Sequence, residues 1–389
     1  MSFPDDERTG HRIRAQRRLA GLTQRGLAAR IPYSYSLLNQ VECGAREATA
    51  DFCTAVARAL GVDVTTLTGQ PVTTPDHAVL APLRMALDLY DIGADGPVTA
   101  RPVPVLAAAA DALCQQVRAT RLRAAAADLA PLITELTHSV HTTASTPGWQ
   151  ALASTYRSAA DISLKLGHLD LSQVALDRMA WAADRASDPI LAAIRQYKRG
   201  LLYKGKDDGA TGRRLVAAGQ VLLTGEASRE ALAVAGQLHL GASALAARVE
   251  DATAVENHVA AARELAGRIG GEAPEVHWLS FGHRNADLHA FGAAVAMRQY
   301  DDALTKARQM KLPASTLTSR RARFLVDRAR AEMETGHLDA ALKHVAAARR
   351  AAPEQTRHYP GTRETITGLV HLSRRTPDTL DHMARWLGI

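Results

Sequence analysis

Helical periodicity runs through nearly the whole chain of 389 residues and leaves little room for other secondary structure. Apolar residues recur at the three- and four-residue spacing of amphipathic helices, and no segment alternates long enough with the two-residue period of a strand. About one residue in five is alanine, which favours helices and suits closely packed helix pairs. The sequence therefore predicts an all-α fold.

The expected helices fall into two groups. Five short ones are predicted within residues 1–70, at 8–19, 23–30, 34–42, 49–60 and 64–67. A proline-containing linker is expected at 71–77, and a series of longer helices at 78–389. That series is predicted at 79–90, 105–118, 121–141, 149–166, 170–185, 190–203, 211–223, 228–248, 252–268, 275–297, 301–309, 319–335, 339–351, 362–374 and 377–387.

Residues 1–70 carry clear signals for where helices start and stop. Thr23 and Ser34 are suitable N-caps, because their hydroxyls accept from the free N–H groups of a first turn. Gly44 and Gly61 supply left-handed exits. Two short helices joined by a tight turn, inside a five-helix domain, are typical of helix-turn-helix architecture.

Three motifs in this region resemble the Cro/lambda-repressor-type DNA-binding domain of the XRE family. They are Leu22-Thr23-Gln24 with Leu27-Ala28, then Tyr33-Ser34-Tyr35-Ser36-Leu37-Leu38-Asn39-Gln40-Val41-Glu42-Cys43-Gly44, then Ala57-Arg58-Ala59-Leu60-Gly61-Val62. The resemblance covers positions 8–69 and implies a transcriptional regulator. Such a regulator is expected to bind a double-stranded, inverted-repeat operator as a homodimer.

The second helix of such a pair is expected to lie in the major groove of DNA, with its N-terminal residues at the base edges. Ser34, Tyr35, Ser36 and Asn39 are therefore the candidates for base contact, and an Asn amide can pair bidentately with adenine. The resemblance implies a phosphate contact for Gln24. Further candidates for phosphate contact are Arg14, Arg17, Arg25 and Arg46.

Simpler roles stay open for several of these residues. Tyr35 could cover the domain surface, and the arginines could form a solvated face. Glu42 is expected to pair with an arginine of the first helix, because a carboxylate beside phosphate is unfavourable.

Net charge adds little to the case for DNA. The chain has a formal charge of +7 and a pI near 9.5, yet residues 1–70 hold nine arginines against seven acidic residues. We therefore expect a steep salt dependence and weak binding by a single domain.

The C-terminal part resembles a tetratricopeptide-like α-solenoid over residues 148–389, with about five or six units. Its motif is clearest at Gly336, Leu338, Ala341, Val345, Ala348 and Pro353, and a 38-residue offset finds a weaker copy from Arg298 to Met310. Solenoids of this kind have concave grooves that bind extended peptides or other ligands.

Groove-facing positions follow from this register. The candidates for ligand contact are Arg157, Asp161, Asn285, His289, Arg323, Asp327 and Arg330. An Asn amide suits a peptide backbone, and an Arg suits a carboxylate. Arg157 with Asp161, and Arg323 with Asp327, are also at the spacing of ordinary i,i+4 pairs.

A Cro-type domain followed by such a solenoid resembles bacterial regulators whose repeat domain senses a peptide or small molecule. A second interpretation is a protein-interaction adaptor, in which the solenoid binds a partner protein.

Other classes of function lack support in the sequence. There is no P-loop, no dinucleotide-binding glycine motif, no His-Glu-x-x-His and no Cys-x-x-Cys, so we expect no catalysis, cofactor or metal. His138 and His141 alone are weak evidence for a metal. Three cysteines, no signal peptide and no long apolar run predict a cytoplasmic protein, near the nucleoid, that does not enter a membrane.

Overall fold

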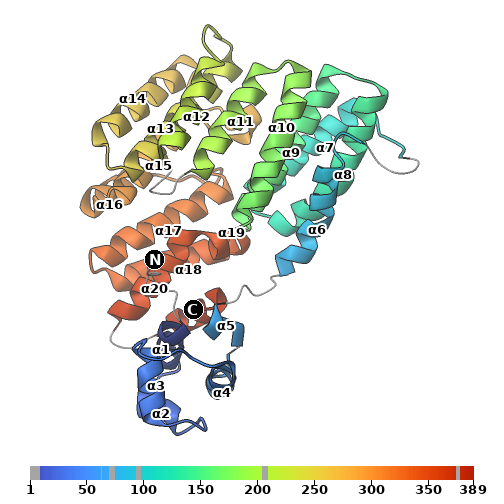
Figure 1. Cartoon of the computed structure of the whole chain (residues 1–389). Coiled ribbons are helices and arrows are strands. Elements are labelled where there is room, and N and C mark those ends of the chain that lie inside the picture. Colours follow the sequence, from blue (N-terminus) through green and yellow to red (C-terminus); the bar gives the residue numbers. More distant parts are fainter. Residues whose placement is uncertain (1–8, 63, 70–74, 93–97, 204–208, 374–376) are drawn as a thin grey trace. The chain divides into compact units, whose positions relative to one another are not determined.

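The structure is a computed structural model that describes residues 9–62, 64–69, 75–92, 98–203, 209–373 and 377–389 (Figure 1). Its regular elements in these ranges are all helices, and an isolated bridge joins Ala273 to Phe281. The all-α prediction is confirmed. None of the helices described is long and apolar enough to cross a membrane.

The chain forms two compact units. The first comprises residues 1–75 and 363–389, and the second comprises residues 76–362. Residues 363–389 were expected in the repeat region, but they group with the N-terminal helices. The helices of the first unit are α1 (Thr9–Leu19), α2 (Gln24–Ala28), α3 (Tyr35–Glu42), α4 (Ala50–Leu60), α5 (Val64–Thr68), most of α20 (Pro360–Leu372) and α21 (Asp378–Leu387).

Side-chain caps start the short helices of the first unit where the sequence predicts them. The hydroxyl of Thr23 accepts a 3.0 Å hydrogen bond from the Gly26 N–H, and that of Ser34 accepts one of 3.2 Å from the Leu37 N–H. The core beneath them consists of Ile13, Leu27, Ile31, Leu38, Val41, Phe52, Val56, Ala57 and Leu67. This core holds α1 to α5 as one domain.

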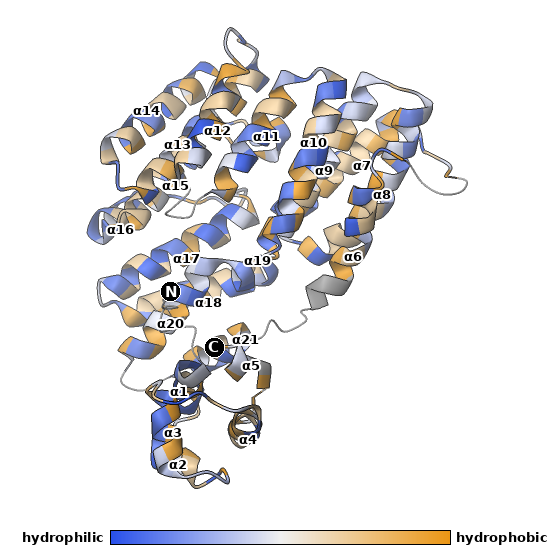
Figure 2. Cartoon of the chain, viewed as in Figure 1, coloured by the Kyte–Doolittle hydropathy of each residue, from blue (hydrophilic) through white to orange (hydrophobic). Residues whose placement is uncertain are grey.

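The second unit runs from α6 to α19. Its elements are α6 (Pro75–Asp88), α7 (Val103–Arg118), α8 (Leu122–Thr142), α9 (Thr146–Lys165), α10 (Leu169–Ala186), α11 (Pro189–Leu202), α12 (Gly209–Val221), α13 (Arg229–Arg248), α14 (Ala252–Arg268), the 3₁₀ turn η2 (Val276–Trp278), α15 (His283–Ala296), α16 (Tyr300–Gln309), α17 (Thr318–Glu334), α18 (Leu338–Ala351) and α19 (Pro353–His358). Each helix carries both apolar and polar residues (Figure 2).

Helices α7 to α18 pack as consecutive pairs, α7 with α8 through α17 with α18. The first helix of each pair also packs against the first helix of the next, so α7, α9, α11, α13, α15 and α17 form one inner row. The second unit is therefore repeat-like. All of the predicted ligand residues lie on α9, α15 or α17, that is, on this inner row.

The predicted helix at 275–297 is wrong in its first part, because a loop occupies residues 269–282 before α15 begins at His283. We call these residues the α14–α15 loop. Positive φ angles interrupt the predicted helix, at +45° for His277, +52° for Trp278 and +59° for Ser280. A helix cannot continue through left-handed residues.

The α14–α15 loop is bound inside the second unit. Its carbonyl at His277 accepts from Arg157 of α9 at 2.9 Å, and its Trp278 indole donates to Asp111 of α7 at 2.6 Å. Phe281 is fully buried against Gly236 of α13. The loop therefore covers part of the inner row, which the sequence predicted to face an open groove.

The last helix of this unit, α19, contacts two of its early helices, α8 and α9. Glu354 accepts hydrogen bonds from the N–H groups of Leu122 and Arg123, at 2.7 and 3.0 Å, at the start of α8. Lys165 of α9 donates to the side chain of Gln355. The row of helix pairs is thus closed by contacts between its two ends.

A methyl group at Gly236 should destabilise the second unit. A Cβ there would lie 1.9 Å from the ring Cζ of Phe281, which forces the ring or α13 to move. We expect Gly236→Ala to lower the free energy of unfolding by about 1–3 kcal/mol, measured by urea denaturation. Gly267→Ala is the matched control, since nothing lies within 4 Å of its Cβ position on α14. It should be neutral or stabilising by up to about 1 kcal/mol, and equal losses for both variants would contradict the packing argument.

Candidate nucleic-acid interface

A buried ion pair joins the first and third helices of the N-terminal domain. Nε and Nη2 of Arg17 donate to the two carboxylate oxygens of Glu42, at 2.6 and 2.8 Å. Nη1 of Arg17 donates to the Leu22 carbonyl at 2.7 Å, beside the turn into α2. The predicted pairing of Glu42 with an arginine of the first helix is confirmed.

This pairing changes the role of Arg17. The residue is 7% exposed and its donors serve Glu42 and Leu22. Such burial does not fit the phosphate contact that the sequence analysis predicts for it. We therefore assign Arg17 to the support of the site.

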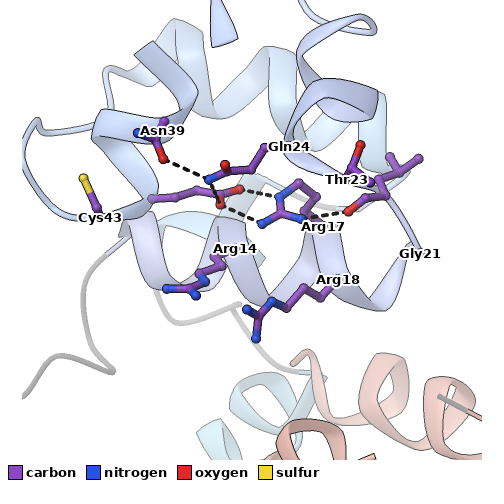
Figure 3. A pocket seen from close by; sticks show the side chains of 10 residues that line it. Arg14, Arg17, Arg18, Gly21, Thr23, Gln24, Asn39 and Cys43 are labelled. Atoms are coloured by element: carbon purple, nitrogen blue, oxygen red, sulfur yellow. Dashed lines mark hydrogen bonds and ion pairs between the residues drawn. The ribbon is translucent and has the colours of Figure 1, made fainter. Parts of the chain in front are cut away.

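Gln24 connects the ion pair to the domain surface. Its Nε2 donates to Glu42 at 2.8 Å and to the Asn39 side-chain oxygen at 3.3 Å, and its Oε1 accepts from the Tyr35 hydroxyl at 3.3 Å. Figure 3 shows the chain of bonds that runs from Asn39 through Gln24 and the Glu42 carboxylate to Arg17. The orientation of the exposed Asn39 amide is thus set by a network rooted in the core.

The predicted base-contact residues share one exposed helix start. Ser34, Tyr35, Ser36 and Asn39 are all exposed on or beside the first two turns of α3. The Ser34 oxygen already caps α3, which leaves its O–H free to donate. Arg25 of α2 lies over the Tyr35 ring, 5.9 Å from its centroid. This cation–π contact presents a positive charge beside α3.

A shallow hollow of about 550 Å³ lies between α1, α2 and α3. Asn39 and Gln24 line it together with the exposed Arg14 and Arg18, which extend from the same face of α1 (Figure 3). The remaining lining residues are Arg17, Gly21, Leu22, Thr23, Glu42 and Cys43. Arg46 is exposed after the end of α3 and does not line the hollow.

Arg18 is a residue that the sequence analysis did not select. Its spacing of four from Arg14 was the available signal, because residues at i and i+4 share a helix face. An anion over the hollow would meet both guanidinium groups and the polar Gln24 side chain. The hollow therefore has the charge and the polar groups that a DNA backbone requires.

The predicted ligand residues of α9 are buried in internal bonds. Arg157 is 1% exposed and donates to the His277 carbonyl and to the Cys114 sulfur, at 2.9 and 3.0 Å. Asp161 pairs with Arg118 of α7 at 2.6 Å and with Lys198 of α11 at 2.7 Å. The i,i+4 pair that the sequence allowed between Arg157 and Asp161 is not formed.

The remaining candidates lie on α15 and α17. Arg323 and Asp327 form the i,i+4 pair at 2.7 Å, and Asp327 also accepts from the Tyr359 hydroxyl at 2.9 Å. Asn285 is 2% exposed and donates to Gln237 of α13 at 2.9 Å. His289 and Arg330 are half-buried.

Charged groups around Asp161 shift one another's pKa values. Burial opposes the charged form of Asp161, yet Lys198 and Arg118 hold the pKa of its carboxyl well below the ordinary range. Burial, together with the neighbouring Arg118, lowers the pKa of Lys165 to about 7. Burial likewise lowers the pKa of Lys198 to about 8, despite the adjacent Asp161.

Metal-binding geometry is not found in the part of the chain that the structure describes, where no three His, Cys, Asp or Glu side chains group as ligands. His141 instead bonds the Thr137 carbonyl through Nδ1 and stacks on Trp181. His138 lies beside the Thr142 hydroxyl.

Breaking the buried ion pair on one side should unfold the N-terminal domain more easily. Glu42→Leu leaves the Arg17 guanidinium buried without its carboxylate, and we expect a loss of about 3–5 kcal/mol. The double variant Arg17→Met, Glu42→Leu removes both charges and should recover most of that loss. Urea denaturation, with hydrogen exchange of α1 and α3, measures both.

The matched control for this prediction is Glu47→Gln, which alters an exposed carboxylate just after α3. It should leave the free energy of unfolding unchanged within about 0.5 kcal/mol. A double variant as unstable as Glu42→Leu would show that the paired charges are not the cause.

Comparison with known families agrees with this geometry for the N-terminal domain. Residues 8–68 match the model of a family described as a helix-turn-helix domain. No curated protein and no solved structure matches the chain. The matched region contains α1 to α5 and every residue of the candidate interface, so the chain carries a helix-turn-helix domain of the kind found in DNA-binding regulators.

Proposed function

We propose that this protein is a sequence-specific transcriptional regulator of the XRE type that binds an inverted-repeat operator as a homodimer. In this proposal the second unit is a tetratricopeptide-like sensor, and its ligand controls the DNA-binding dimer. The protein works in the cytoplasm at the nucleoid and has no catalytic role.

One observation carries the DNA-binding part. Asn39 is exposed on α3, while its amide is oriented through Gln24 by the buried pair of Arg17 and Glu42. An amide held in one orientation loses little conformational freedom on contact with a base, which favours specific readout. A surface polar residue without a reading role would not need such support.

The cations around α3 support the same proposal. Arg14, Arg18 and Arg25 are exposed on α1 and α2, and Arg46 is exposed after α3. They would contact phosphates and position α3 in the major groove, while α3 reads sequence. Because one domain offers few such contacts, two domains about 34 Å apart, one turn of DNA, would share one operator.

Control by the second unit would be a population shift. A ligand that binds one arrangement of the dimer better than another moves the equilibrium toward it, by no more than its difference in affinity. A change in the spacing of the two domains would then alter operator affinity. The competing proposal, an adaptor whose solenoid binds a protein, keeps its partner when α3 is altered.

Selection from a random double-stranded DNA library at low salt tests base reading. We expect enrichment of an inverted repeat, and Asn39→Ala should weaken binding to it by about 5- to 150-fold, the range that 1–3 kcal/mol for a bidentate contact represents. Gln40→Ala, at the next exposed position of α3, is the matched control and should cost much less. Failure to enrich any repeat, or equal losses in both variants, would reject the proposal.

Salt titration separates the phosphate contacts from the base contacts. Arg14→Gln and Arg18→Gln should each reduce the slope of log K against log salt by about one and weaken binding alike on all sequences. Arg213→Gln, an exposed arginine of α12, is the control and should leave the slope unchanged. An unchanged slope in the α1 variants would place the hollow outside the DNA contact.

A further inference from the structure

One face of α9 carries a stripe of charged residues in the interior of the second unit. Arg157, Asp161 and Lys165 follow one another at four-residue spacing, so they share that face of the helix. Arg118 comes to it from α7 and Lys198 from α11, since both bind Asp161. We call Arg118, Arg157, Asp161, Lys165, Lys198 and Arg320 the inner charge cluster.

Arg320 joins this cluster from α17. Its guanidinium donates to the Leu279 carbonyl of the α14–α15 loop at 3.1 Å. It acts electrostatically on Lys165, and Arg118 acts on it in turn. Four helices and one loop therefore contribute to a single cluster.

Positive charge in the inner charge cluster exceeds negative charge by far. Its five cations meet one carboxylate, Asp161, which Arg118 and Lys198 already share. Among the residues that the structure describes, no carboxylate lies at ion-pair distance from Arg157, Lys165 or Arg320. Their partners are neutral groups, namely the His277 carbonyl, the Cys114 sulfur, the Gln355 amide, the Leu279 carbonyl and, for Arg320, the Tyr197 hydroxyl as well.

The nearby carboxylates have other partners. Asp327 binds Arg323 and Tyr359, Glu354 binds the N–H groups at the start of α8, and Glu230 pairs with His277. None of them is available to balance the cluster. Burial lowers the pKa values of Lys165 and Lys198, and the neighbouring Arg118 adds to that lowering while Asp161 opposes it.

Unused donors lie within the cluster. Nε of Arg157, which is 1% exposed, and Nε of Arg118 have no acceptor. A buried guanidinium without its full set of acceptors is costly, and an anion would remove that cost. Lys165 and Arg320 are only half-buried, so solvent has access to this part of the interior.

We propose that the inner charge cluster is the binding site of a small polyanion, with Arg118, Arg157, Lys165, Lys198 and Arg320 as its ligand-binding residues. With all five cations protonated the surplus is four positive charges, which favours a ligand with at least two negative charges, such as a phosphorylated or polycarboxylate metabolite. The α14–α15 loop and α19 cover the inner row, which favours a compact ligand over an extended peptide. That this ligand is the regulatory signal rests on the proposed function above. Its binding to the inner charge cluster does not depend on that function.

Inorganic pyrophosphate and citrate are the probes, compared by isothermal titration calorimetry and thermal unfolding of the full chain. We expect at least one to bind and to raise Tm. Lys165→Met and Arg320→Met should each weaken that binding at least tenfold. Lys306→Met is the control, because Lys306 is a partly exposed lysine of α16 paired with Asp302, outside the inner charge cluster, and it should not change binding.

The unliganded variants give a second readout that a structural role would not produce. Removal of a surplus cation, at the half-buried Lys165 or Arg320, should leave Tm of the free chain equal or higher, although the rise in Tm caused by pyrophosphate is lost. A Lys165→Met chain that is less stable, yet gains the same rise in Tm from the probe, would overturn the proposal. So would the absence of binding by both probes.

Proton uptake checks that the bound anion is at the lysines. Lys165 faces Arg118, Asp161, Lys198, Arg320 and Gln355, and an anion among these groups would raise the pKa of Lys165 from about 7. At pH 8, binding should therefore take up protons, which calorimetry in buffers of different ionisation enthalpy measures. Lys165→Met should reduce the uptake to the share of Lys198, whose pKa is about 8. Binding without proton uptake, or uptake that is undiminished in Lys165→Met, would place the anion elsewhere.

Operator binding separates this proposal from the proposed function. Asn39→Ala should bind the probe with unchanged affinity, and Lys165→Met without probe should bind the operator normally. If the probe binds but leaves operator affinity unchanged, the anion site stands and its regulatory role fails. If no operator is found, the proposed function fails, while the anion site is judged by calorimetry alone.

Discussion

A buried arginine must find a negative partner or weaken the fold that holds it, and the two units of this chain meet that constraint differently. In the N-terminal domain, Arg17 has both oxygens of Glu42 and the Leu22 carbonyl. In the second unit, Arg157 has only a carbonyl oxygen and a sulfur atom. The first arrangement is complete without a ligand, and the second gains from one.

Complete pairing in the N-terminal domain has a functional consequence at its surface. The Glu42 carboxylate binds Arg17 and also Gln24, and Gln24 in turn binds Asn39. Rigid support from the core to an exposed amide prepares α3 for base contact before any DNA arrives. The same network removes Arg17 from the surface, so that Arg14 and Arg18 are the cations of α1 that remain for phosphate.

Much of the fold could be predicted because its signals are local. Caps such as Thr23 and Ser34 and exits such as Gly61 depend on neighbouring residues alone, and they lie where the sequence predicts them. The pairing of Glu42 could also be predicted from electrostatics. The α14–α15 loop could not, because a helical pattern continues through 275–282 while contacts with distant α9, α7 and α13 select another conformation.

The partners of the charged residues in the second unit could not be predicted for the same reason. The repeat register placed Arg157, Asp161 and Asn285 on inner helices, where the structure has them, but it could not tell which helix would supply the partner of each. Spacing allows an i,i+4 pair of Asp161 with Arg157 as an alternative to ligand contact, whereas Asp161 binds Arg118, 43 positions earlier, and Lys198, 37 positions later. Long-range pairing of this kind is decided by packing, and local spacing contains no information about it.

Incomplete pairing in the second unit links ligand binding to stability. Surplus buried charge lowers the free energy of unfolding of the second unit. An anion that binds only the folded unit raises that free energy again by mass action. The pKa values of Lys165 and Lys198, lowered to about 7 and about 8, mean that part of the surplus is released as protons near neutral pH. Between the lowered pKa and the ordinary value of 10.5, the unfolded chain binds more protons, so these lysines make the unit less stable as pH falls toward 7. A bound anion would offset this loss of stability most strongly at the pH at which the lysines are most charged. The difference in stability between the empty and the occupied unit is then largest.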